Sequence, residues 1–385
     1  MTSWTRKTDR DVTARPSAFH LRRLVGLAAR VALAAVVVIA SSLVGLSLYA
    51  RRSAEPVRLG LHPPTETEPA LVYLNAARDR FIVAGIDGSV RDERDAGGSI
   101  HLFAMHPTGN AVAAWRETPA GAFELVIWQV GGGVRTLLGP TSEFPVGKPV
   151  WSSRGTEVAA SLAVLPPPEH RSPGSPPISS RLLVVPANGQ TATEIAAYGA
   201  EASIVPIALT DRVIAGVRGR DRYIVIDLGG KHVREDVTLT GLTASYGADS
   251  QQGLVFAVLR DGTTAQSETL RTWRIDGFNV GAVSIVSPTV NAPIIWRGRE
   301  DIVFGTGTSL RALNLPTGTV RDLAAENTIV MPVAFLPTGD RLMVERILAP
   351  NLKVYELDGD RFKPALASLV LPGDKVRLVG WTTGR

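Results

Sequence analysis

Residues 150–161 have the sequence VWSSRGTEVAAS, in which two short apolar segments flank a polar turn that contains a glycine. This pattern predicts a strand ending at Trp151, a tight turn over residues 152–155 and a second strand through Val158 and Ala160. Weaker copies recur at residues 105–115, 296–305 and 335–345, and a half-copy occupies residues 380–385. Their spacing of roughly 40–50 residues is typical of the blades of a β-propeller.

The composition agrees with many short strands joined by turns. The 385 residues are 45% hydrophobic and 20% charged, and they include 37 glycines and 26 prolines. Beyond residue 70, no window of about 12 residues keeps the apolar period of a helix, so this part is expected to be nearly all β. The chain has no cysteine, which excludes disulfides, cysteine-based zinc sites and thiol catalysis.

The N-terminal part has a different character. Residues 1–30 are polar and basic, whereas residues 31–50 (VALAAVVVIASSLVGLSLYA) carry no charge. At 1.5 Å per residue, a helix of this length spans a hydrocarbon core of roughly 30 Å. We therefore expect a cytoplasmic segment over residues 1–30, a transmembrane signal-anchor helix over residues 31–50 and an extended linker over residues 51–69.

The charges beside the apolar segment indicate its orientation. Seven Lys and Arg residues precede it and three follow it closely, so the positive-inside rule places the N-terminus in the cytoplasm and residues 70–385 outside. The expected location is a single-pass position in the plasma membrane. A buried core helix and a cleaved signal peptide, hinted at by Arg22 and Arg23, are the alternatives. The long apolar run and the lack of a clean cleavage site favour an anchor.

The rest of the chain divides into repeated units. Six complete units and one unit shared between the two ends indicate seven blades, although the stretched spacing between the third and fourth units also allows six or eight. The first unit has strands at residues 70–74, 80–86 and 90–93 but lacks an inner strand. Residues 376–381 supply one, so we expect the last strand to pair with the first blade and close the ring. Six tryptophans on expected strands are assigned to packing between blades: Trp115, Trp128, Trp151, Trp273, Trp296 and Trp381.

The repeat resembles a known family. A strand, an aromatic residue, a glycine turn and a further strand, followed by a hairpin with a Tyr-x-Leu core, are similar to the TolB-like or WD40-like repeats of bacterial envelope proteins. The best matches are residues 151–158, 335–342 and 353–359, and the resemblance covers residues 70–385. It implies a β-propeller and a place in the bacterial envelope. The aspartate that usually precedes the turn glycine is missing here, where Pro-Thr-Gly and Ser-Arg-Gly occur instead.

No motif predicts a reaction. The chain lacks a Gly-x-Ser-x-Gly nucleophile elbow and a Walker phosphate loop. His101 and His106 lie five residues apart on or beside one strand and are expected on opposite faces, which argues against a shared metal. We assign no catalytic, cofactor-binding or metal-binding residue and expect no cofactor. Paired carboxylates contributed by different blades stay open, because the sequence does not show which residues converge.

One rim of the propeller is a candidate partner surface. In a four-stranded blade, the loops between the second and third strands and the connections between blades share one rim, here called the loop-rich rim. Residues 166–177 (PPPEHRSPGSPP) form such a loop by composition and are expected to project. Five arginines are placed at this rim as candidate partner-binding residues: Arg171, Arg218, Arg220, Arg222 and Arg260. An ordinary solvated rim is the alternative.

These observations favour a membrane-anchored extracytoplasmic propeller that acts as a non-catalytic protein-interaction or ligand-binding module. Its partner is expected to be a protein or an envelope polymer at the loop-rich rim. No nucleic acid partner is expected, because much of the net charge of +5 lies in the N-terminal sixty residues. An alternative is a hydrolase or lyase acting on glycans or peptides at the central channel. An envelope sensor that signals inward is a third reading, although the short N-terminal segment leaves no room for a signalling domain.

Overall fold

The structure is a computed structural model, and all the residues that it describes lie in one compact unit, Pro56–Arg385. The described residues are 69–85, 89–170, 176–199, 203–219, 221–239, 242–260, 267–275, 283–287, 289–296, 299–336, 339–346, 352–369 and 377–382. The predicted cytoplasmic segment, membrane helix and nearly all of the linker lie outside these residues. Within the described residues, no helix is long and apolar enough to cross a membrane.

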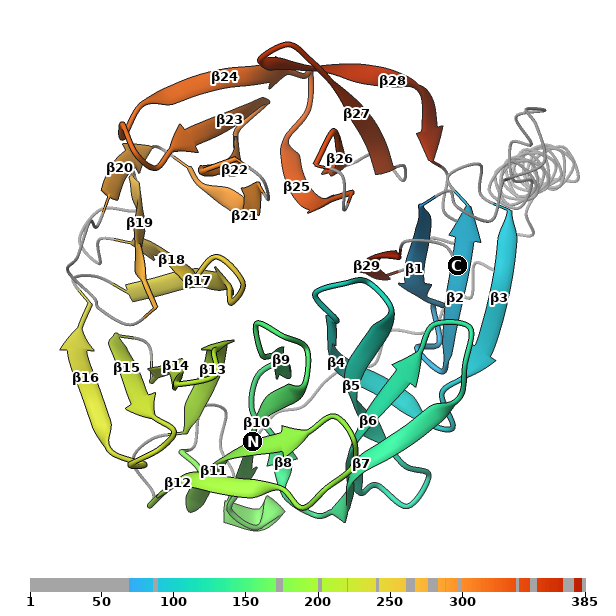
Figure 1. Ribbon diagram of the computed structural model, residues 1–385, viewed down its shortest axis with the longest axis vertical. Coiled ribbons are helices and arrows are strands. Elements are labelled where there is room, and N and C mark those ends of the chain that lie inside the picture. Colours follow the sequence, from blue (N-terminus) through green and yellow to red (C-terminus); the bar gives the residue numbers. More distant parts are fainter. Residues whose placement is uncertain are drawn as a thin grey trace, which may run out of the picture. The chain divides into compact units, whose positions relative to one another are not determined.

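The described chain forms seven antiparallel sheets arranged as blades around a central axis (Figure 1). Blade 1 combines the C-terminal strand with the first three strands: β29 (Arg377–Thr382), β1 (Ala70–Leu74), β2 (Arg80–Gly85) and β3 (Val90–Asp95). Blade 2 runs outward from the channel through β4 (Ser99–Met105), β5 (Ala111–Glu117), β6 (Phe123–Gln129) and β7 (Val134–Thr141).

Blade 3 contains β8 (Phe144–Pro145), β9 (Val150–Trp151), β10 (Glu157–Val164), β11 (Ser179–Pro186) and β12 (Thr193–Tyr198). Blade 4 contains β13 (Ile204–Leu209), β14 (Val213–Arg218), β15 (Arg222–Asp227) and β16 (Val233–Thr238). Blade 5 contains β17 (Leu242–Asp249), β18 (Leu254–Arg260), β19 (Glu268–Arg274) and β20 (Val283–Ser287).

Blade 6 contains β21 (Asn291–Trp296), β22 (Asp301–Thr306), β23 (Ser309–Asn314) and β24 (Val320–Ala325). Blade 7 contains β25 (Val330–Phe335), β26 (Arg341–Arg346), β27 (Leu352–Asp358) and β28 (Arg361–Leu369). The described residues contain one helical turn, the 3-10 helix Pro168–His170, inside the loop expected between β10 and β11. The prediction of an all-β, seven-bladed propeller is therefore confirmed.

The ring closes as the sequence predicted. β1 pairs with β29, and Ala70 faces Thr382 while Leu74 faces Arg377. The two ends of the propeller therefore meet at the rim where the other blades turn from their first to their second strand, here called the turn rim. Because the last strand completes the first sheet, blade 1 has an inner strand like the other blades.

The core lies between the blades. In β5, Val112 and Ala114 share a cluster with blade 1, whereas Ala113 and Trp115 share a cluster with blade 3. Alternate residues point to opposite faces of a strand, so a strand covered on both faces must be apolar throughout. Trp128 accordingly stacks on Phe81 of blade 1, with ring centroids 4.8 Å apart.

The other tryptophans whose side chains are described pack in the same way. Trp115, Trp151, Trp273 and Trp296 are each at most 5% exposed and belong to clusters that join neighbouring blades. The prediction of packing between blades is confirmed for these residues and for Trp128. The side chain of Trp381 lies outside the described residues.

The inner strand of blade 3 differs from expectation. The sequence predicts one strand that ends at Trp151, whereas the observed strand begins at Phe144 and is interrupted between β8 and β9. The interruption spans Gly147, Lys148 and Pro149. Gly147 has a positive φ of 76°, and proline has no backbone N–H to donate, so a regular ladder cannot continue through these residues.

Candidate functional site in the central channel

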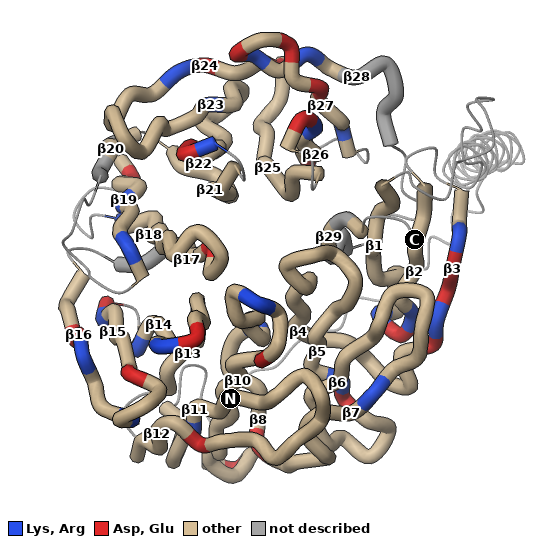
Figure 2. The backbone as a smooth tube through the Cα atoms, viewed as in Figure 1, with Lys and Arg blue, Asp and Glu red and all other residues tan. Residues whose placement is uncertain are grey.

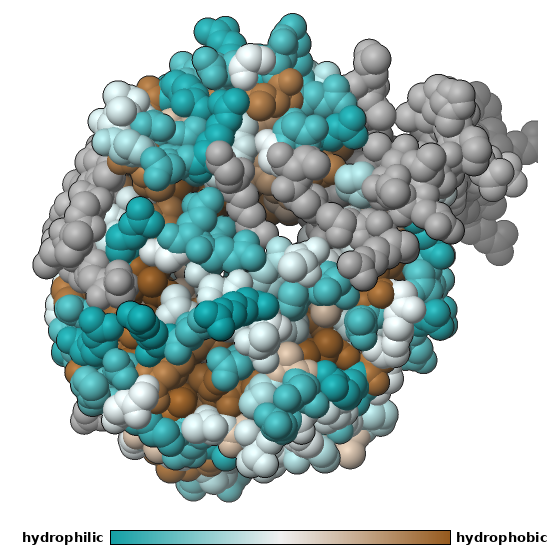
Figure 3. Space-filling model, viewed as in Figure 1, coloured by the Kyte–Doolittle hydropathy of each residue, from teal (hydrophilic) through white to brown (hydrophobic). Residues whose placement is uncertain are grey.

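A cavity of about 430 Å³ opens on the channel side of blades 2 to 5. The inner strands β4, β9, β13 and β17 and adjacent turn residues build it. In Figure 3, hydrophilic residues border the central opening of the face shown, and hydrophobic residues lie between the blades. The cavity is lined by His101, Leu102, Phe103, Ala104, Met105, Pro107, Lys148, Pro149, Val150, Trp151, Ile207, Ala248, Asp249, Ser250 and Gln251.

The interruption of the inner strand in blade 3 places Lys148 at this cavity. Before it, the Val146 N–H donates to Ser161 O at 2.9 Å, and after it Val150 faces Ala159. Residues 147–149 therefore replace a regular rung of the ladder and bulge away from β10.

The bulge is held from the neighbouring blade. A Cβ atom added at Gly147 would lie 2.4 Å from Cγ1 of Val205 in β13, which is too close for any side chain. Together with its positive φ, this contact restricts position 147 to glycine. The fold thus fixes the backbone that presents Lys148.

Lys148 has a charge without a protein partner among the described residues, where neither a hydrogen bond nor an ion pair engages its ammonium group. The other described lysines all have one: Lys231 donates to Glu194 O at 2.9 Å, Lys353 pairs with Glu326 at 2.5 Å, and Lys363 pairs with Asp358. Burial by the surrounding protein lowers the pKa of Lys148. Water nevertheless reaches the exposed side chain, so we take it as charged at neutral pH.

The other ionisable groups of the cavity are committed to local structure. Asp249 is 6% exposed, and its Oδ1 accepts hydrogen bonds from the N–H groups of Gln251 and Gln252 at 2.8 and 3.2 Å. It therefore caps the turn from β17 to β18. His101 Nε2 lies 2.7 Å from Glu117 Oε2 of β5. Neither group is within ion-pair distance of Lys148.

The apolar side of the cavity is rigid. The indole N–H of Trp151 donates a hydrogen bond to Ala104 O in blade 2 at 3.0 Å. The ring of His106 packs edge-on against the ring of Trp151, with ring centroids 4.6 Å apart. His106 Nε2 also lies 3.2 Å from Gly155 O. Burial lowers the pKa of His106, and the interaction with this carbonyl offsets only part of the decrease. These contacts fix Trp151 between two blades. The cavity therefore offers a preformed surface rather than one that must be assembled.

Three of the predicted partner-binding arginines are described, and each lies at the loop-rich rim and forms an ion pair. Arg218 and Arg222 flank the β14–β15 loop and both pair with Asp236, at 3.2 and 2.7 Å. Arg260 ends β18 and pairs with Glu268 at 2.7 Å. Figure 2 shows basic and acidic residues close to each other around the ring. Arg171 and Arg220 lie outside the described residues.

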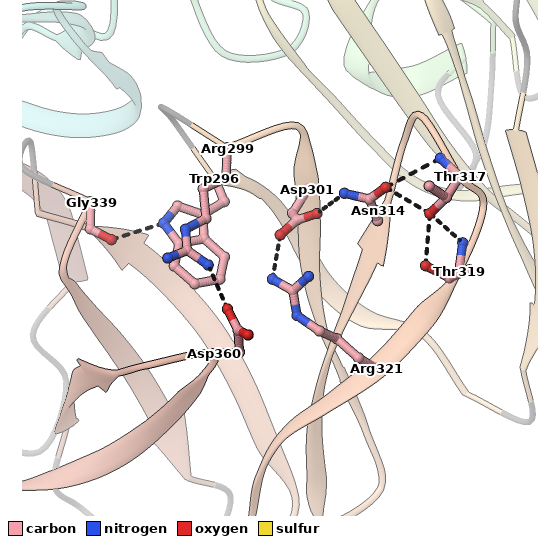
Figure 4. Close-up of polar contacts among 9 residues, drawn as sticks. All are labelled: Trp296, Arg299, Asp301, Asn314, Thr317, Thr319, Arg321, Gly339 and Asp360. Atoms are coloured by element: carbon pink, nitrogen blue, oxygen red, sulfur yellow. Dashed lines mark hydrogen bonds and ion pairs between the residues drawn. The ribbon is translucent and has the colours of Figure 1, made fainter.

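A second polar cluster, in blade 6, was missed from the sequence (Figure 4). Asp301 is 2% exposed and accepts hydrogen bonds from Asn314 at 2.8 Å and Arg321 at 2.6 Å. Nearby, Trp296 donates to Gly339 O of blade 7 at 2.8 Å, and Arg299 lies 4.7 Å above its ring. Because the carboxylate of Asp301 is fully engaged, we assign this cluster to stability.

No group of three His, Cys, Asp or Glu side chains in the described part of the chain could hold a metal ion. His101 contacts Glu117 of β5, and His106 contacts Gly155 O of blade 3. The sequence also missed Lys148. Its only signal was the Gly-Lys-Pro triplet just before the strand at Val150, which combines two residues that interrupt strands.

The chain is similar to solved structures in its fold, but it matches no known family. No family model matches the chain, and no curated protein matches it. An oligogalacturonate lyase in complex with manganese superposes with a TM-score of 0.57 at 12% identity, covering 75% of this chain and 91% of that one. The oligogalacturonate lyase from Vibrio parahaemolyticus superposes with a TM-score of 0.55 at 12% sequence identity, and the match covers 75% of this chain and 92% of that one. A chain of the mitotic checkpoint complex superposes with a TM-score of 0.53 at 11% sequence identity, and the match covers 85% of this chain and 91% of that one. At such identities the likeness concerns the fold alone.

Proposed function

We propose that this protein is a non-catalytic binding module whose ligand site is the channel cavity. One observation carries the proposal. The fold interrupts an inner strand, at a position that only glycine tolerates, and thereby presents Lys148 to the cavity without a partner among the described residues. Cavities of several hundred Å³ with a few polar groups on an apolar lining are the usual form of small-ligand sites.

The setting that we propose is extracytoplasmic. The apolar residues 31–50 and their basic N-terminal flank support a single membrane anchor with the N-terminus in the cytoplasm. The repeat pattern supports a place in a bacterial envelope. Protease treatment of intact cells is the direct test: the propeller should be digested from outside, and full protection of the propeller would overturn this topology.

The loop-rich rim is the proposed contact for a protein or envelope polymer. Arg218, Arg222 and Arg260 are paired with acids, so they would act as hydrogen-bond donors with partly neutralised charge. Guanidinium groups retain unused N–H donors when one acid binds them, which leaves capacity for a partner carboxylate.

Site-specific photo-crosslinking in intact cells tests the channel site. A photoreactive phenylalanine analogue at Gln251, an exposed residue at the cavity, should yield a crosslinked ligand or partner. The matched control is the same residue at Gln190, an exposed turn position in blade 3 away from the cavity. Equal products from both positions, or none from Gln251, would refute the channel site.

A second candidate function is a lyase or hydrolase acting on glycans or peptides. It is favoured by the two oligogalacturonate lyases among the structural neighbours and by the lowered pKa of Lys148, since lowering the pKa of a lysine increases the share of its neutral form, which can accept a proton. The discriminating measurement is turnover of oligogalacturonates and peptides by the full chain. Activity that Lys148→Met abolishes would replace the binding module with an enzyme.

A further inference from the structure

We propose that the channel cavity recognises a small organic acid, with the carboxylate of the ligand at the Lys148 ammonium group and its apolar body against the inner strands. This inference rests on the proposed function and names the ligand class of the same site. It follows from the charges of the cavity, from the nature of its lining and from its size.

The lining contains three ionisable residues, His101, Lys148 and Asp249. Asp249 is held by two backbone N–H groups of its own turn, and His101 is held by Glu117. Lys148 is the ionisable group of the described lining that lacks a protein partner. A ligand anion would form an ion pair with the Lys148 ammonium group. The surrounding protein that lowers the pKa of Lys148 also makes such an ion pair stronger than it would be in open water.

A second polar group supports a ligand with oxygen atoms. The Ser250 hydroxyl accepts a hydrogen bond from the Leu209 N–H at 3.1 Å. A hydroxyl has one donor as well as acceptor capacity, so the proton of Ser250 stays available to a ligand oxygen. Ser250 and Lys148 come from blades 5 and 3, so a ligand that uses both would span the cavity.

The apolar lining argues against a simple inorganic anion. Phe103 and Met105 of β4, Trp151 of β9 and Ile207 of β13 contribute hydrophobic surface to the same cavity. Phosphate and sulfate gain little from such surface and prefer several donors, as at a helix N-terminus or an arginine cluster. One unpaired cation beside apolar side chains, in a lining that also offers polar groups, fits a monocarboxylate with an apolar body. A volume of about 430 Å³ suits a small molecule.

Competitive acylation of lysines tests the inference on the full chain in detergent. The protein is treated with an N-hydroxysuccinimide ester, and mass spectrometry measures the labelling rate at each lysine. N-acetyl-leucine should slow labelling of Lys148, by roughly threefold at twice its Kd, because only the free fraction reacts. Lys231, which is exposed and distant in blade 4, is the internal control and should label at an unchanged rate.

The uncharged N-acetyl-leucinamide has nearly the same shape and should give no protection. Inorganic phosphate should also give none. Equal protection by the amide would show that the carboxylate is not recognised, and equal protection by phosphate would show that the apolar body is not. Either result overturns the inference, as does the absence of any protection by N-acetyl-leucine or by a series of apolar monocarboxylates.

Calorimetric titration with N-acetyl-leucine on two variants provides an independent measurement. Lys148→Met keeps the apolar stem and should lose binding, whereas Lys148→Arg should retain it; unchanged melting temperatures confirm that both are folded. If crosslinking from Gln251 persists while carboxylates neither protect nor bind, the ligand class is wrong and the channel site stands. If crosslinking also fails, the proposed function itself is wrong.

Discussion

Leu71 of β1 lies opposite Trp381 of β29, so residues near the two ends of the propeller share one rung of an antiparallel ladder. This ladder completes blade 1 and closes the ring. A ring of blades buries both faces of each sheet only when it is closed, so the stability of all blades depends on this contact.

Removal of β29 tests this dependence. Deleting residues 377–385 should expose the edge of β1 and lower the free energy of unfolding by several kcal/mol, since blade 1 loses its inner strand. The matched control deletes residues 383–385 alone, which follow β29. Urea unfolding gives the stability, and amide exchange in β1 should accelerate only in the longer deletion. Unchanged amide exchange in β1 would mean that the stability of the ring does not depend on the pairing of β1 with β29.

The bulge at Gly147 makes a second prediction. Gly147→Ala combines a positive φ with a steric clash against Val205, so it should destabilise the fold by about 2–4 kcal/mol. Gly131→Ala is the matched control, because Gly131 has a φ of 74° but no atom within 4 Å of an added Cβ. It should cost only about 1 kcal/mol.

A compensating change separates the two causes in Gly147→Ala. Adding Val205→Ala removes the clashing methyl groups and should recover part of the lost stability, although the backbone strain remains. Denaturant unfolding of Gly147→Ala, Val205→Ala, the double variant and the control Gly131→Ala measures each contribution. If Gly147→Ala and Gly131→Ala cost the same, the contact with Val205 does not restrict the bulge.

The sequence predicted the blades well because each depends on local features. An apolar strand, a glycine turn and a second strand lie within a few residues of each other, and the repeat marks the blade period. Closure was also predictable, since a first unit without an inner strand and a last half-unit complement one another. The structure confirmed seven blades and the pairing of β29 with β1.

The site could not be predicted in the same way. Met105, Lys148, Ile207 and Asp249 meet at the cavity but come from four different blades, and no local pattern states which inner strands face the same part of the channel. The ion pairs of the rim arginines were hidden for a related reason. Asp236 reaches Arg218 and Arg222 across a strand register that contains a bulge, which sequence spacing does not reveal.

The buried cluster in blade 6 gives a third prediction. Asp301→Ala should destabilise the protein by about 3 kcal/mol, because it leaves Arg321 and Asn314 without their buried acceptor. Asp322→Ala is the control: Asp322 pairs with Arg311 on the same blade, but its side chain is 69% exposed, and the loss should be much smaller. Similar losses in urea unfolding would contradict the assignment of Asp301 to stability.

The rim arginines give a fourth prediction. Replacing Arg218 and Arg222 by alanine should weaken crosslinking to a partner bound at the loop-rich rim, with little change in melting temperature, because their ion pairs with Asp236 are partly exposed and such pairs contribute little to stability. Arg154→Ala is the matched control. Arg154 also forms an ion pair, with Asp211, but it belongs to the turn rim. A captured partner that is retained equally by all variants would exclude these arginines as its contact.

The contact between blades 6 and 7 should make stability depend on pH through Glu326. Burial raises the pKa of Glu326, but hydrogen bonds from Lys353 and Tyr355 and the charges of Lys353 and Arg346 outweigh it, so the pKa lies below its ordinary value of 4.5. A carboxyl group with a lowered pKa stabilises the fold above its unfolded pKa, and this contribution is lost as the pH falls through the folded value.

Glu326→Gln should therefore be less stable than the unmodified protein at neutral pH, and the difference should shrink as the pH falls below about 4.5. Urea unfolding of both proteins across this range measures the difference directly. Glu356→Gln is a suitable control, because Glu356 pairs with Arg341 but is 52% exposed, and its effect should be small throughout. A difference for Glu326→Gln that stays constant down to acidic pH would show that its charge does not hold the two blades together.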